Sequence, residues 1–116
     1  SINTTKLLTV KYQSLGMEER IDKSIEIIIY RIIQELLNNV MKHADATNAF
    51  VQLIREGARL NVVVEDNGKG FNTNLAENNK GAGLENIRSR VDYLKGQLDI
   101  HAGPGKGTLV NIEFNI

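Results

Sequence analysis

Apolar residues recur between residues 18 and 43 at intervals of three and four, which is the spacing of a helix with one buried face. This pattern predicts a helix over residues 18–43, with a break near residues 22–24 where Ser24 would cap the longer part. The side chains expected on its buried face are those of Ile33, Leu36, Leu37, Val40 and Met41.

The polar face of this helix has an unusual composition. Its side chains also lie three or four residues apart and form one stripe: Arg31, Glu35, Asn38, Asn39 and Lys42, with His43 bordering it. Asparagine is a poor helix former, so two adjacent asparagines in mid-helix need a reason. A carboxylate, two amide oxygens and a cation on one stripe could hold a hydrated metal ion and a phosphate.

The rest of the chain predicts strands and a second helix. Five strands are expected, over residues 5–12, 49–55, 60–66, 97–102 and 108–114, the first of them at a sheet edge. The second helix ends at Gly96 and has one apolar face, formed by Leu84, Ile87, Val91 and Leu94. These elements predict a single α+β domain over residues 1–116: a two-layer sandwich with both helices on one face of a mixed, mostly antiparallel sheet.

Glycines cluster after the strand that ends at Asp66. The segment Asp66-Asn67-Gly68-Lys69-Gly70 reads in isolation as a tight turn, but no returning strand follows it. A calcium loop is excluded because its third and fifth positions are glycines. What remains is a carboxylate beside a backbone without side chains, which lets a flat ligand approach closely.

Two more glycine clusters follow. Gly81 and Gly83 precede the second helix, where free backbone amides suit phosphate oxygens, although neither the dinucleotide-binding nor the Walker pattern fits. Residues 103–107 link the last two strands, and Thr108 puts a hydroxyl at the start of the final strand. His101 lies within a strand pattern and is interpreted as structural.

Composition narrows the function classes. Fourteen basic residues balance fourteen acidic ones without a basic run, so nucleic acid is not favoured as a partner. The absence of cysteine excludes disulfides and thiolate sites, and neither histidine has zinc-type companions. No apolar run approaches the length of a membrane span and no signal peptide opens the chain. The first residue is Ser, which suggests a fragment of a longer protein.

Four short motifs occur in order: Glu35-x-x-x-Asn39, Asp66-x-Gly68-x-Gly70, Gly81-x-Gly83-Leu84 and Gly107-Thr108. Together they resemble the four ATP-site boxes of the GHKL superfamily, which joins sensor histidine kinases with gyrase, a heat-shock chaperone and a mismatch-repair ATPase. The stretches 30–35, 42–44 and 83–91 look like those of sensor kinases paired with NarL/LuxR-type response regulators. The resemblance covers residues 18–114 and implies the Bergerat-type ATP-binding fold.

The resemblance also implies roles. Asn39 would ligate the Mg²⁺ held by the ATP phosphates, Glu35 would act as general base or orient water, and Lys42 would help neutralise the phosphates. Asp66 would accept a hydrogen bond from the adenine amino group, with Thr108 near the same ring edge. The remaining nucleotide-binding positions implied are His43, Gly68, Gly70, Gly81, Gly83 and Leu84, with Gly81 and Gly83 closing a lid over the phosphates.

The function implied is that of the Mg-ATP-binding catalytic part of a cytoplasmic sensor histidine kinase, whether or not the parent protein is membrane-anchored. Its partners would be an upstream dimerisation domain carrying the acceptor histidine and, indirectly, a response regulator, without membrane contact by this domain. The fragment alone is not expected to autophosphorylate. Two alternatives stay open: a stand-alone GHKL serine kinase of the anti-sigma type, and a nucleotide-binding interaction module without kinase activity. One departure is the last strand, which lacks the usual proline and ends Glu113-Phe114-Asn115-Ile116.

Overall fold

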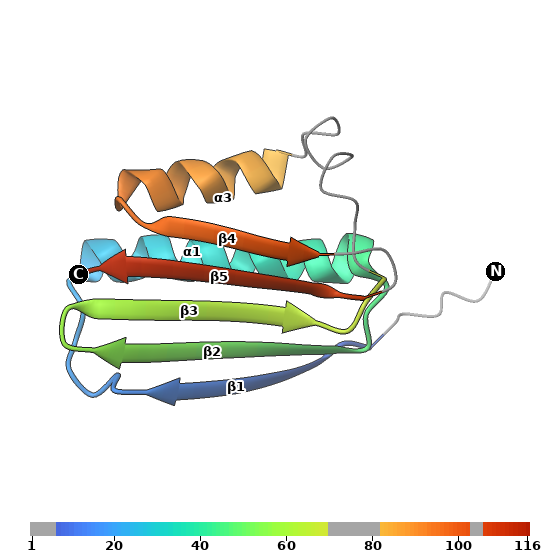
Figure 1. Ribbon diagram of the computed structural model, residues 1–116, viewed down its shortest axis with the longest axis horizontal. Coiled ribbons are helices and arrows are strands. Elements are labelled where there is room, and N and C mark those ends of the chain that lie inside the picture. The colour runs from blue at the N-terminus through green and yellow to red at the C-terminus, as the bar shows by residue number, and fades with distance from the viewer. Residues whose placement is uncertain (1–6, 70–81, 103–105) are drawn as a thin grey trace.

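The structure is a computed structural model that describes residues 7–69, 82–102 and 106–116, with the backbone alone at 43–44 and 82–84. Its described strands form one sheet in the order β1-β2-β3-β5-β4 (Figure 1). They are β1 (Thr9–Leu15), β2 (Asn48–Glu56), β3 (Arg59–Asp66), β4 (Gln97–Ala102) and β5 (Thr108–Asn115). β1 runs parallel to β2 at one edge and the other neighbours are antiparallel. The mixed, mostly antiparallel sheet is confirmed.

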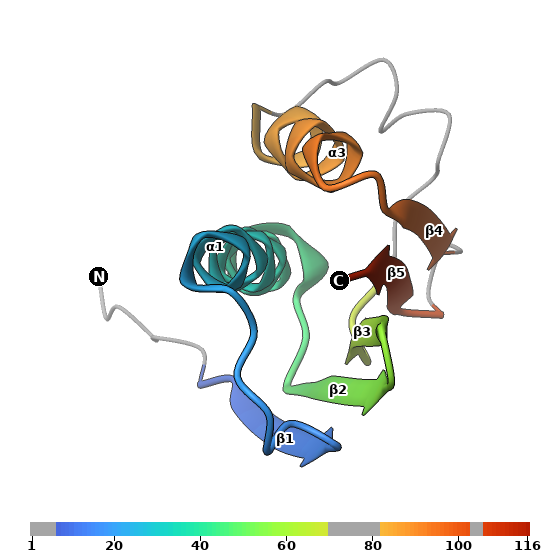
Figure 2. The same ribbon diagram turned by 90° about the vertical axis from the view of Figure 1, so that its left-hand side faces the viewer.

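Two α-helices cover one face of this sheet, α1 (Lys23–Asn39) and α3 (Ala82–Tyr93), and a π-helical turn (Val40–Ala44) continues α1. Figure 2 shows both helices on the same side of the curved sheet, which confirms the two-layer sandwich. None of the described helices is long and apolar enough to cross a membrane.

Alternation along the central strands builds the core. In β3 and β5 every second side chain is buried and faces the helices, while its neighbours face the open side of the sheet. These positions interdigitate with the inner faces of α1 and α3. The side chains with the least exposure are Ile32, Leu60, Val62, Ile87, Val91, Ile112 and Phe114.

The first strand and the start of α1 differ from the prediction. β1 begins at Thr9 because its pairing with β2 runs from Thr9 opposite Asn48. The helix begins at Lys23, and the cap is Asp22, whose carboxylate accepts a hydrogen bond from the Ser24 backbone N–H at 3.4 Å. The prediction of Ser24 as cap was therefore wrong by two residues.

The buried face of α1 also differs at its C-terminal end. Met41 was expected in the core, but it is 67% exposed. The reason is the π-helical turn that starts at Val40. Its i→i+5 hydrogen bonds change the helical phase, so a spacing of three or four residues no longer returns to the same face.

The end of α3 depends on two adjacent residues. Lys95 has a φ of 57°, so it takes the left-handed conformation that was expected at a glycine. Gly96 is required for another reason: a Cβ atom there would lie 2.8 Å from Cδ1 of Phe114. This close packing joins the end of α3 to β5.

Candidate functional site

One end of the molecule gathers the predicted site residues. Figure 1 shows that α1 and β3 end on the side where β5 and α3 begin. Asn39 ends α1, Asp66 ends β3, Thr108 starts β5, and Gly83 lies in the first turn of α3. Residues far apart in the sequence are therefore brought to one end of the helix–sheet sandwich.

Asp66 and Thr108 are directly paired across β3 and β5. Both side chains are buried, at 7% and 9% exposure, on the helix-facing side of the sheet. Oδ1 of Asp66 accepts a hydrogen bond of 2.8 Å from the backbone N–H of Gly68. The Asp-x-Gly spacing thus bends the chain back onto the carboxylate and holds its orientation.

Burial raises the pKa of Asp66 above its ordinary value of 3.8, and backbone hydrogen bonds involving Gly68 and Thr108 oppose that rise. A desolvated carboxylate lacks the water that normally solvates its lone pairs. It is therefore a strong acceptor for a ligand donor such as an exocyclic amino group.

Gly107 allows the two strand ends to approach. Its φ is 75°, and a Cβ atom there would strike the backbone carbonyl oxygen of Asp66. From the sequence alone, residues 103–107 could have been merely a link between two strands. The structure describes two of these residues, Lys106 and Gly107. Gly107 is needed for both its conformation and its proximity to Asp66.

Asn67 forms a clamp that the sequence analysis missed. Its Oδ1 accepts hydrogen bonds from the backbone N–H groups of Thr47 and Asn48, at 3.0 and 2.9 Å, and its Nδ2 donates to Oγ1 of Thr47 at 2.9 Å. These bonds tie the turn after β3 to the segment between the π-helical turn and β2. The Asn-Gly dipeptide drew attention to turn formation and hid this long-range role.

A hollow of about 670 Å³ opens at the ends of β3, β4 and β5. Its lining includes Asp66, Thr108, Lys106 and His101. His101, interpreted from the sequence as structural, has an exposed side chain.

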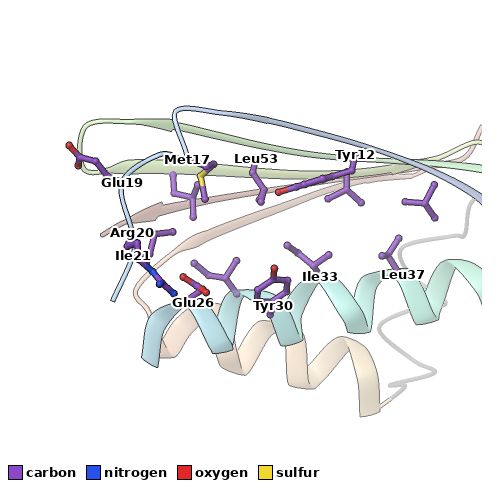
Figure 3. Close-up of a pocket in the computed structure, with 14 residues that line it drawn as sticks. Tyr12, Met17, Glu19, Arg20, Ile21, Glu26, Tyr30, Ile33, Leu37 and Leu53 are labelled. Atoms are coloured by element: carbon purple, nitrogen blue, oxygen red, sulfur yellow. The ribbon is translucent and has the colours of Figure 1, made fainter. Parts of the chain in front are cut away.

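A separate groove of about 490 Å³ lies between β1 and α1 (Figure 3). Its walls are mainly apolar and include Tyr12, Tyr30 and Ile33. Its lining contains none of the predicted site residues, so the groove is distinct from the Asp66 site.

The polar stripe of α1 is partly preserved. Glu35 and Asn39 are half-buried on α1, whereas Lys42 lies exposed on the π-helical turn that follows. The same turn contains His43, whose side chain lies outside the described residues. Its expected place beside the stripe therefore stays a prediction.

The glycine-rich second and third motifs are only partly described. Gly68 is buried at the Asp66 turn, and Gly83 and Leu84 belong to α3 by their backbone. Gly70 and Gly81, together with the expected lid, lie outside the described residues.

The described side chains fit magnesium better than a metal held by several carboxylates or histidines. The described residues contain no group of three His, Cys, Asp or Glu side chains that could hold a metal ion. Mg²⁺ takes oxygen ligands, keeps several waters and is commonly held by one or two protein groups plus substrate phosphates. A single half-buried amide such as Asn39, at the end of α1, fits that requirement.

Arg90 of α3 forms a contact with the polar stripe that the sequence did not predict. Its Nη1 lies 4.0 Å from Oε1 of Glu35, and the side chains are 28% and 30% exposed. This ion pair connects the two helices beside the site.

Comparison with known proteins decides the family. The profile of the histidine kinase-, DNA gyrase B- and HSP90-like ATPases matches residues 24–116. The chain belongs to this family. Membership in this family of ATPases implies a nucleotide ligand, and the match includes the whole Asp66 site.

Two curated relatives extend the comparison of this histidine kinase-like ATPase. The signal transduction histidine-protein kinase/phosphatase DegS of Brevibacillus brevis is 38% identical over 108 residues, which cover 92% of this chain and 28% of that protein. The sensor histidine kinase ComP of Bacillus subtilis is 36% identical over 97 residues, or 83% of this chain and 13% of that protein. The chain thus spans less than a third of either relative.

Solved structures agree with the fold. The blue-light activated histidine kinase of Erythrobacter litoralis is 30% identical, with a TM-score of 0.76 over 93% of this chain and 35% of that one. The Acinetobacter baumannii histidine kinase AdeS has a TM-score of 0.75 at 18% identity, covering 96% of this chain and 55% of that one, which supports the fold alone.

Proposed function

We propose that this domain binds Mg-ATP where α1 and β3 end, and that it transfers the γ-phosphoryl group to a histidine on a separate dimerisation domain. The observation that carries the proposal is the buried Asp66–Thr108 pair, which faces the helix layer at the same end as Asn39. The names of the relatives DegS and ComP favour a sensor histidine kinase over an anti-sigma serine kinase.

Asp66 and its turn bind the base. The carboxylate accepts a hydrogen bond from the adenine amino group while the Gly68 N–H keeps it oriented. Burial excludes water from this contact, and Thr108 places a hydroxyl beside it. Gly68 leaves room for the flat ring to approach the backbone.

The end of α1 binds the phosphates. The amide oxygen of Asn39 would hold Mg²⁺, Lys42 would add positive charge, and Glu35 would orient the attacking group or accept its proton. When bound, the metal neutralises the phosphate charge and helps to place the γ-phosphorus in line. The half-burial of Glu35 and Asn39 limits the range of positions that their side chains can take.

The acceptor histidine comes from outside this domain. His101 belongs to β4, and His43 belongs to the helical segment that forms part of the site wall. Neither backbone position is free to move a side chain into line with the γ-phosphorus. We therefore propose a dimerisation domain that presents the acceptor as the direct partner. The resemblance to the NarL/LuxR-paired kinases supports a response regulator of that type as the indirect partner, and a cytoplasmic location.

Calorimetry on the purified chain tests binding, and a transfer assay tests the kinase role. Mg-ATP should give a saturable heat, with an affinity that is modest if a lid must be ordered on binding. Labelled ATP should then label a histidine-bearing dimerisation domain supplied in trans, in acid-labile form, and should leave the chain alone unlabelled. No binding at millimolar nucleotide would refute the nucleotide site, whereas binding without transfer would refute the kinase role alone.

A further inference from the structure

The ion pair between α1 and α3 joins Glu35 to a guanidinium nitrogen that has no hydrogen-bond partner among the described residues. Nη1 of Arg90 is buried, and among the described residues it has no hydrogen-bond acceptor. The nearest charge is Oε1 of Glu35 at 4.0 Å, which is too long for a hydrogen bond but within reach of electrostatic attraction. A buried guanidinium nitrogen without a partner is uncommon and calls for a functional explanation.

Fold stability does not supply that explanation. Both side chains keep more than a quarter of their surface exposed, and ion pairs of this kind contribute little to folding. The helix–helix contact already has apolar anchors in Ile87 and Val91, which flank Arg90 on the inner face of α3. An aliphatic residue would pack at this position at lower desolvation cost.

The position of Glu35 offers a functional explanation for the unpartnered nitrogen of Arg90. Glu35 lies one helical turn before Asn39, so its carboxylate is beside the end of α1 assigned above to the phosphates. A glutamate side chain there can adopt several rotamers, and only some of them direct the carboxylate toward the attacking group. The Arg90 guanidinium on the neighbouring helix favours, through its charge, those Glu35 rotamers that keep the carboxylate at the α1–α3 contact.

We propose that Arg90 is a positioning residue for phosphoryl transfer, acting through Glu35, whose carboxylate it holds across the α1–α3 contact. The inference rests on the proposed kinase function. It assigns to α3 a part in the reaction through Arg90, in the last turn of that helix. Arg90 does not touch ATP in this proposal, so its loss affects the rate of transfer and leaves nucleotide affinity in place.

The experiment compares Arg90→Gln, Arg90→Lys and the control Arg88→Gln, which removes an exposed charge from the same helix. Each variant is assayed for its maximal rate of transfer from Mg-ATP to the dimerisation domain, and for its KM for ATP. We expect Arg90→Gln to lower the maximal rate roughly 10- to 100-fold with KM within about twofold, because small misplacements of a reacting group cost that much. Arg90→Lys should recover part of the rate, and Arg88→Gln should behave as wild type.

A Glu35→Gln background separates positioning from other roles. If Arg90 acts through Glu35, adding Arg90→Gln to Glu35→Gln should lower the rate no further. A further loss of the same size in that background, or an unchanged rate for Arg90→Gln alone, would overturn the inference while the wild-type kinase function stands. Loss of nucleotide binding in folded Arg90→Gln would also overturn it. A wild-type domain that transfers nothing refutes the proposed function, and the inference falls with it.

Discussion

Replacing Asp66 with asparagine removes one negative charge and keeps an oxygen that can accept the 2.8 Å hydrogen bond from Gly68. The local turn should therefore survive. The acceptor for the adenine amino group changes from a charged carboxylate to a neutral amide oxygen. The amide also brings an NH₂ group, which cannot accept a hydrogen bond from the adenine amino group. Hydrogen bonds to charged groups contribute about 1.5–3 kcal/mol, so the dissociation constant should rise roughly 10- to 150-fold. The burial of Asp66 favours the upper part of that range.

Stability should change in the opposite direction. Because burial raises the pKa of Asp66 in the folded protein, the ionised carboxylate opposes folding at neutral pH. Between 3.8 and the raised pKa the folded state binds more protons than the unfolded state, so the stability contributed by this group falls as pH rises through that window. Asp66→Asn removes that effect. The variant should be more stable than wild type at neutral pH, and the difference should shrink as pH falls towards 3.8.

Two measurements decide this prediction. Calorimetry with ADP in the presence of a chelator isolates the base contact, and denaturant unfolding at several pH values gives the stability difference. Asp99→Asn is the control, because it removes an exposed carboxylate from β4. An Asp66→Asn variant that binds ADP as tightly as wild type would refute the assignment of the carboxylate to the base. A variant less stable than wild type at neutral pH would show that its hydrogen bonds outweigh its desolvation.

Three other substitutions test the remaining parts of the site. Asn39→Ala should weaken ATP binding more with magnesium than with a chelator, and equal losses in both titrations would contradict its role as metal ligand. Asn67→Ala loses three side-chain hydrogen bonds and should lower the free energy of unfolding by about 1–3 kcal/mol, whereas Asn67→Asp should lose less because it keeps the acceptor oxygen. Gly107→Ala should cost more stability in denaturant unfolding than the control Gly57→Ala, which also has positive φ but would meet no atom within 4 Å; equal costs would exclude the predicted collision with Asp66.

The strands and the buried face of the sheet were predictable, because apolar and polar residues alternate along a strand as its side chains alternate between the buried and the open face. In β3 the residues that alternate in the sequence are those that alternate in burial, and the same holds for β5. The pairing of Asp66 with Thr108 follows from strand register, which local patterns do not fix. Only the resemblance to a known family assigned these two residues to the same site from the sequence.

The features that were missed depend on hydrogen bonds or packing between distant segments. The π-helical turn after Asn39 cannot be read from apolar spacing, because one turn with a different hydrogen-bonding pattern leaves the average period nearly unchanged. Asn67 resembles any turn asparagine until Thr47 and Asn48 are placed beside it. Arg90 resembles any arginine at the end of an amphipathic helix.

The site is held differently at its two ends, and this predicts different consequences of mutation. At the proposed base end, the Asp66 region is fixed by strand pairing and by the Gly68 and Asn67 hydrogen bonds, where the central strands β3 and β5 meet. At the proposed phosphate end, Glu35 contacts Arg90 of the neighbouring helix at 4.0 Å, and both side chains are partly exposed. Substitutions at the base end should therefore alter the affinity for ADP and ATP alike. Substitutions at the helix contact should instead alter the rate of transfer, since that contact can reorganise without unfolding the domain.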